Sequence, residues 1–204
     1  MLIRVLTRRE RVEGVCGYAP GGTLPPMKRL GPVVVAAAAL LLVAAPAQAQ
    51  EVTIADPQGD SRPAALDIIS VTARNLDKSV VATMTFPSTT DSSDIIVSVD
   101  PRGGTGVRMV SRFQPAGLGT TKNYVLRKAF PDRGHSNKRV ACRGLKFREG
   151  MSDAGPTITL RMPSTCLNDG NYGALRFAVL IERGPGDADW APGTGGSTAW
   201  VPRG

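Results

Sequence analysis

Beyond residue 65, the apolar residues of this chain recur at every second position, in short runs separated by Gly, Pro, Asp, Ser or Asn. Alternation with a period of two turns one side of a strand toward a core and the other toward solvent, so it predicts half-buried β-strands. The clearest run spans residues 175–182, where Phe177 and Val179 face one way and Arg176 and Glu182 face the other.

Eight or nine such runs follow one another after residue 50, and no stretch there keeps a 3.6-residue apolar period for three helical turns. Strands this short and numerous fit two packed sheets. The sequence therefore predicts an all-β fold, an antiparallel β-sandwich of jelly-roll type, with a closed barrel as the alternative. The Gly- and Pro-rich residues 184–196 are expected to form a loop before a last strand. The expected strands are 69–73, 80–86, 95–99, 107–113, 124–126, 143–148, 158–162, 175–182 and 198–201.

An export signal is predicted at residues 27–49. A basic pair, Lys28-Arg29, precedes 13 uninterrupted apolar residues at 33–45, and Ala47-Gln48-Ala49 is a small-residue cleavage site. A membrane-spanning helix needs about 20 apolar residues, so a cleaved signal is favoured over a retained anchor. Residues 1–26 are then an over-extended or disordered N-terminus. The prediction is a secreted single domain, residues 50–204, with no membrane anchor after cleavage.

Charge and cysteine content are interpreted on residues 50–204. Six of the 25 Lys and Arg residues and two of the 17 Asp and Glu residues precede residue 50, so the net charge falls from +8 to +4. This mild basicity does not favour a nucleic-acid partner. Of three cysteines, Cys142 and Cys166 remain, and in an exported chain we expect them to form a disulfide. The alternative is a reactive Cys142 thiol served by His135.

A catalytic constellation is missing from the sequence. The single histidine, His135, lies in a polar stretch, and no G-x-S-x-G, H-E-x-x-H or P-loop motif occurs. We therefore expect a protein that is not an enzyme. The basic residues between 133 and 148 have one interleaved aromatic, Phe147, and are expected to guard an edge strand rather than to bind nucleic acid.

Carboxylates mark one candidate site. Asp56 and Asp60 flank a tight turn, Asp67 follows at a strand entry, and calcium prefers clustered loop oxygens of this kind. Asp187 and Asp189 join them if the two ends of the chain meet. The alternative is that these Asp side chains cap turns and satisfy their own backbone.

Trp190 and Trp200 mark a second candidate site. An exposed tryptophan can stack on a sugar ring, which makes both residues candidates for ligand binding. In the alternative, Trp200 packs as part of the last strand and Trp190 plugs a loop.

Three segments carry a family resemblance: 56–60, 66–71 and 80–86. They resemble the DOMON-like and carbohydrate-binding β-sandwich superfamily, and also a set of uncharacterised secreted actinobacterial proteins. Residues 162–167, with Pro163 before Cys166-Leu167, are similar to a later signature of that second set. The resemblance implies a β-sandwich, glycan binding and a structural calcium held by Asp56, Asp60 and Asp67.

The sequence leaves two functions open. One is a non-catalytic extracellular binding module for a glycan or another cell-surface polymer. The other is a structural or adhesion-type domain of the envelope that binds no small molecule. An exposed aromatic side chain beside polar groups favours the first, and buried tryptophans favour the second.

Overall fold

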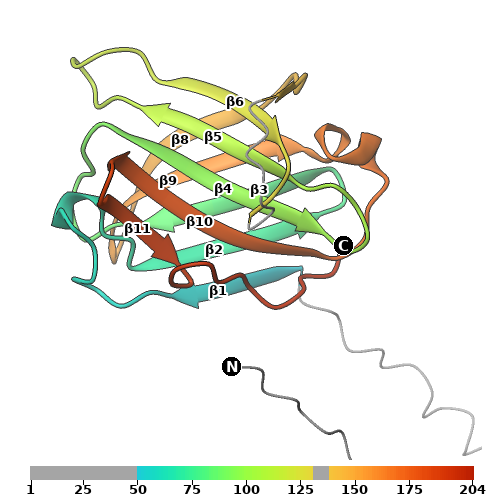
Figure 1. The fold of residues 1–204 in the computed structure, drawn as a ribbon, viewed down its shortest axis with the longest axis horizontal. Helices are drawn as coiled ribbons and strands as arrows, with labels where there is room; N and C mark the ends of the chain where they lie inside the picture. Colours follow the sequence, from blue (N-terminus) through green and yellow to red (C-terminus); the bar gives the residue numbers. More distant parts are fainter. Residues whose placement is uncertain (1–49, 131–137) are drawn as a thin grey trace, which may run out of the picture. The chain divides into compact units, whose positions relative to one another are not determined.

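Two antiparallel sheets make up the described part of the chain. A computed structural model describes residues 50–130 and 138–204. Within them, a five-stranded sheet has the order β1-β2-β3-β9-β8 and a six-stranded sheet the order β11-β10-β4-β5-β6-β7 (Figure 1). The predicted all-β sandwich is confirmed. The predicted signal peptide, residues 1–26 and His135 lie outside the described residues.

The described residues hold 11 strands, where eight or nine were expected. The first sheet contains β1 (Glu51–Ala55), β2 (Ser70–Leu76), β3 (Ser79–Thr85), β8 (Lys146–Ser152) and β9 (Gly155–Pro163). The second contains β4 (Ser93–Pro101), β5 (Val107–Phe113), β6 (Lys122–Arg127), β7 (Arg139–Val140), β10 (Leu175–Gly184) and β11 (Asp187–Ala191). Three 3₁₀ turns join them: η1 (Ala64–Leu66), η2 (Ser164–Cys166) and η3 (Asn168–Gly170).

Two local expectations were wrong. Residues 184–196 are not all loop, because β11 pairs there with β10 as an edge strand. Residues 198–201 are not a strand, because only an isolated bridge links Val201 to Leu175. Among residues 50–130 and 138–204, no helix is long and apolar enough to cross a membrane.

The core lies between the sheets and follows from the alternation. On β10, Phe177, Val179 and Ile181 are fully buried, and they lie opposite the equally buried residues of β4. The five-stranded sheet contributes residues such as Met84 and Leu160. Burying large apolar side chains from both sheets supplies the main favourable term in folding.

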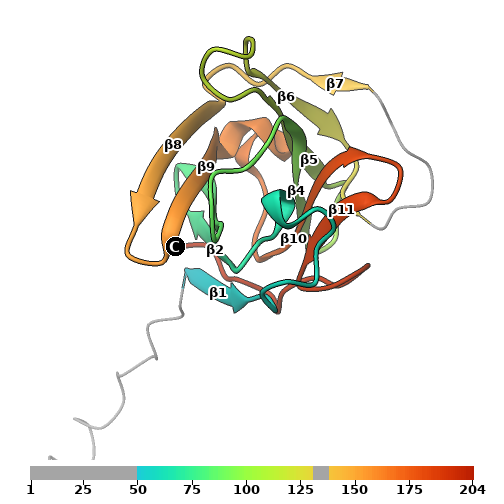
Figure 2. The ribbon, with the colours of Figure 1, turned by 90° about the vertical axis from the view of Figure 1, so that its left-hand side faces the viewer.

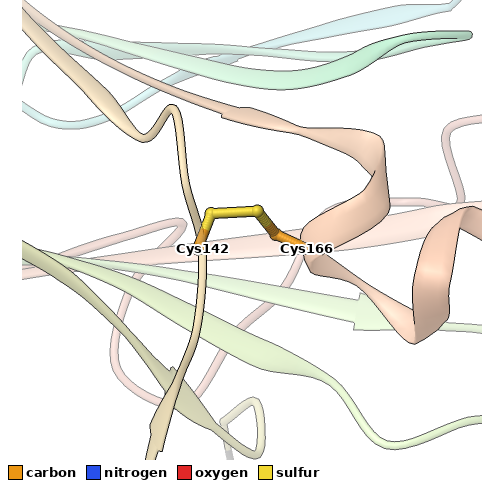
Figure 3. Close-up of a disulfide and its surroundings, with 2 residues drawn as sticks. All are labelled: Cys142 and Cys166. Carbon is orange, nitrogen blue, oxygen red and sulfur yellow. A yellow bond between two sulfur atoms is a disulfide. The ribbon is translucent and has the colours of Figure 1, made fainter.

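A disulfide joins Cys142 to Cys166, as predicted (Figure 3). Cys142 follows β7 of the six-stranded sheet, and Cys166 lies in η2, directly after β9 of the five-stranded sheet. The bond therefore links the two sheets covalently.

The chain between β1 and β2 runs beside β11. Figures 1 and 2 both place η1 next to that strand, and an isolated bridge joins Arg62 to Ala188. The backbone amide of Ile68 donates to Asp189 Oδ2 at 2.7 Å. An edge of the first sheet is thereby attached to an edge of the second, which brings acidic residues from both ends of the domain together.

Three of the basic residues between 138 and 148 lie on edge strands. Lys146 and Arg148 lie on β8, the last strand of the five-stranded sheet, and both are exposed. Arg139 lies on β7, the last strand of the other sheet, with its guanidinium 4.5 Å from the ring of Tyr124. Charged side chains on edge strands hinder pairing with another chain, which agrees with the guarding role expected from the sequence.

Candidate functional site

Three carboxylates meet where the β1–η1 connection lies against β11. Oxygens of Asp56, Asp60 and Asp189 all lie within 4.8 Å of one another. Asp56 directly follows β1, Asp60 closes the next turn, and Asp189 points inward from the middle of β11. Asp56 and Asp189 are buried, with exposed fractions of 8% and 5%, and Asp60 is exposed. We call these three residues the carboxylate cluster.

Asp67 has a different role from the one expected. Both of its carboxylate oxygens accept the backbone amide of Gly59 at 3.0 Å, which holds the turn that carries Asp60. Gly59 has a φ of 90°, a conformation that a residue with a side chain rarely adopts. Asp67 thus holds the turn through Gly59, and Asp189 is the carboxylate that lies beside Asp56 and Asp60.

Asp187 is not a member of the carboxylate cluster. Its carboxylate pairs with Arg183 at 2.9 Å on the surface. Successive residues of a strand point to opposite sides, so Asp187 and Asp189, two apart, would be expected on one side. The β10–β11 register shifts between Glu182 and Gly184, beside Asp187.

Among the described residues, no Lys or Arg forms an ion pair that balances the negative charge of the carboxylate cluster. None of the ion pairs within residues 50–130 and 138–204 involves a member of the cluster. Burial, followed by the charges of Asp189 and Asp60, raises the pKa of Asp56 from 3.8 to about 7. Burial also raises the pKa of Asp189, although the amides of Ile68 and Trp190 donate to its carboxylate. Charged carboxylates here therefore have no ion-pair partner in the part of the chain that the structure describes.

The donor set fits a hard divalent cation. It consists of carboxylate oxygens without thiolate or imidazole, which suits calcium or magnesium better than zinc. Because Asp60 is exposed, the cluster is open to solvent on one side.

The two tryptophans are half-buried and held by other side chains. Trp190 lies on β11 with its ring centroid 5.3 Å from that of Phe130. The ring of Trp200 has guanidinium carbons of Arg102 and Arg176 at 5.0 and 5.2 Å. Trp190 lies opposite Leu180 of β10, about 13 Å along that strand from Arg176, so the two rings do not form one clamp.

A groove of about 710 Å³ lies at the end of the six-stranded sheet where β10 meets β11. Glu182 of β10, Asp94 of β4 and Arg112 of β5 stand side by side across its floor, on the side of the sheet that faces away from the core. Asp94 Oδ2 is 3.6 Å from Arg112 Nε. Burial raises the pKa of Asp94, and Arg112 lowers it.

The walls of the groove add neutral donors and acceptors. At one side, Ser92 Oγ donates a hydrogen bond to Gln114 Oε1 at 3.0 Å. Arg183, which pairs with Asp91 and Asp187, borders the other side. A concave surface with convergent polar groups of both charges is typical of a site for a polar ligand.

Sequence reasoning did not find the groove. Alternation shows that Arg112 and Glu182 face away from the core, but it does not show that they share a surface. Only the strand order β10-β4-β5 brings Glu182, Asp94 and Arg112 into one row.

The sequence matches no protein-family model and no curated protein. The resemblance to DOMON-like and carbohydrate-binding sandwiches therefore stays a prediction.

Proposed function

We propose that this protein is a secreted, non-catalytic binding module whose ligand is a glycan or a similar hydroxyl-rich polymer of the cell surface. The observation that carries the proposal is the polar groove on the six-stranded sheet, with Asp94, Arg112 and Glu182 in a row.

The chemistry of the groove supports this ligand class. A sugar hydroxyl both donates and accepts hydrogen bonds, carboxylates accept them, and a guanidinium donates several in a fixed plane. Asp94, Glu182 and Arg112 supply both kinds of partner, and Gln114 supplies a neutral amide. Bonds to charged groups are stronger than neutral ones, so a few of them can orient a polar ligand.

Secretion is supported by two features. The disulfide is of a kind that forms and persists in oxidising compartments. Residues 27–49 have the composition of a cleaved export signal.

A structural envelope domain is the second candidate. It is favoured by the environment of Trp190 and Trp200, which are half-buried and engaged with Phe130 and two arginines. Rings held in this way are poor platforms for a sugar. In that case the groove has no ligand.

The test is a glycan-panel binding assay with the variant Arg112→Ala. Arg112 is largely exposed, so its loss should leave the fold intact, while removal of charge-assisted hydrogen bonds should weaken glycan binding roughly 10- to 100-fold. Arg161→Ala is the matched control, because Arg161 is an exposed arginine of β9 in the other sheet. It should bind like the unaltered protein.

Three results would count against the proposal. Failure of every glycan to bind would leave the structural domain as the better account. Equal losses in Arg112→Ala and Arg161→Ala would remove the groove as the site. Release of shortened glycans would contradict the non-catalytic assignment, since Asp94 and Glu182 are two carboxylates on adjacent strands.

A further inference from the structure

We propose that Asp56, Asp60 and Asp189 form a calcium site that fastens the β1–η1 connection to the edge strand β11. The site is separate from the glycan groove. It also differs from the ligand set that the sequence suggested, because Asp189 replaces Asp67.

Geometry is the first support. Calcium binds oxygens at about 2.3–2.6 Å, so two oxygens on one ion lie at most about 5 Å apart. Oxygens of all three carboxylates lie within 4.8 Å of one another. One ion can therefore contact all three without rearrangement of the backbone.

A buried, unpartnered oxygen is the second and independent support. Asp56 is 92% buried, and its Oδ2 makes no hydrogen bond. Most buried polar atoms in folded proteins have a partner, because leaving one without costs free energy. A cation held between Asp56 and its two neighbours supplies the missing interaction.

Charge is the third support. The groups that raise the pKa of Asp56, besides burial, are the carboxylates of Asp189, Asp60 and Asp67. Two of the three cluster members are buried side by side, and within residues 50–130 and 138–204 neither forms an ion pair with an arginine or lysine. A divalent cation would neutralise a concentration of negative charge that no ion pair among the described residues neutralises.

Calcium is preferred over magnesium for two reasons. Calcium accepts irregular sets of six to eight oxygens, some of them from water, whereas magnesium requires a near-ideal octahedron at about 2.0–2.1 Å. Three carboxylates from a turn and a strand, with Asp60 on the solvent side, make an irregular and partly open set.

The position of the site gives it a structural consequence. Asp56 follows the first strand of one sheet, and Asp189 lies in the last strand of the other. An ion bound by both adds a link between the sheets at their edges. It also orders Trp190, whose amide donates to Asp189 Oδ1 at 2.7 Å.

The experiment uses the protein freed of metal with EDTA and dialysed at pH 7.5. Calcium chloride is added in a calorimetric titration and in thermal melts. At about 100-fold excess over the dissociation constant, calcium should raise the melting temperature by roughly 5–10 °C. Magnesium chloride at the same concentration should give a clearly smaller shift. No heat and no shift at about 10 mM calcium, roughly tenfold above the dissociation constants of the weakest sites, would overturn the proposal. An equal magnesium shift would overturn the choice of ion.

Asp56→Asn tests the residue assignment without relying on a disruptive change. The variant should lose at least about 10-fold in calcium affinity. In EDTA it should melt at or above the temperature of the unaltered protein, because a buried charge among carboxylates is gone. Asp153→Asn, an exposed acid in the β8–β9 turn, removes the same charge and should respond to calcium normally. Unaltered calcium binding in Asp56→Asn, or an equal loss in Asp153→Asn, would refute the assigned ligands.

Discussion

Removal of the Cys142–Cys166 disulfide should destabilise the domain by an amount set by the loop that it closes. The cysteines are 24 positions apart. For a loop of this size, the chain-entropy relation gives about 3.5 kcal/mol of lost unfolding free energy at 25 °C. In a domain of this length, about 1 kcal/mol corresponds to roughly 2–4 °C, so the melting temperature should fall by about 7–14 °C. The loss of about 3.5 kcal/mol is a large part of a typical total stability of about 5–15 kcal/mol.

The assay compares thermal melts of the oxidised protein, the protein reduced with excess thiol reagent, and the double variant Cys142→Ala with Cys166→Ala. The variant should melt slightly below the reduced protein, because Cys166 is 7% exposed and its replacement leaves a small void. Reductant should not affect the variant, which serves as the control for side effects of the reagent. A shift below about 2 °C on complete reduction would refute the idea that this bond constrains the unfolded chain.

Two further predictions concern the carboxylate cluster and the export signal. In EDTA, the free energy of unfolding should fall by at most about 4 kcal/mol as the pH rises from about 4 to 7. The pKa of Asp56 is about 7 in the folded state and 3.8 in the unfolded state. The folded state therefore binds more protons than the unfolded state in this pH range. Urea titrations across this range check it. The fall should be missing in Asp56→Asn and in saturating calcium, and an equal slope in that variant would show that Asp56 is not responsible. N-terminal sequencing of the protein from culture medium should find a start near Gln50, and a product that retains residues 27–49 would contradict the cleaved signal.

The fold class could be predicted because burial on one side of a sheet imposes alternation on the sequence. On β10 and β4 this signal is complete, and every core-facing side chain from Ile95 to Val99 and from Phe177 to Ile181 is buried. The strands that were not predicted lack this alternation of buried apolar residues. β1 contributes only half-buried Val52 and Ile54, and β11 turns Asp189 and Ala191 inward in place of large apolar residues.

Candidate site residues could be predicted directly where they are neighbours in sequence, and at a distance only on the condition that the two ends of the chain meet. Asp56 and Asp60 share a turn, so their proximity follows from local structure. Asp189 is 129 positions from Asp60, and its place beside it depends on β11 forming and lying next to η1. The row of Glu182, Asp94 and Arg112 likewise depends on strand order, which alternation within a single strand does not contain.

The disulfide and the carboxylate cluster lie at opposite ends of the sandwich. Cys166 follows the end of β9, which pairs with the start of β3 at Ser79. Asp56 follows the end of β1, which reaches the other end of β3 at Thr85 through Ser70 of β2. The seven residues of β3 separate the two ends by about 20 Å, a distance at which stabilising effects are usually additive.

This arrangement explains why a domain of this kind can use two different links between its sheets. The bond to Cys142 constrains the unfolded chain whether or not a ligand is present. Calcium at the proposed site would act on the folded state alone, and its contribution would grow with the calcium concentration. The calcium-poor domain should therefore open first at the β1–β11 edges, while the end that holds Cys142 and Cys166 stays closed.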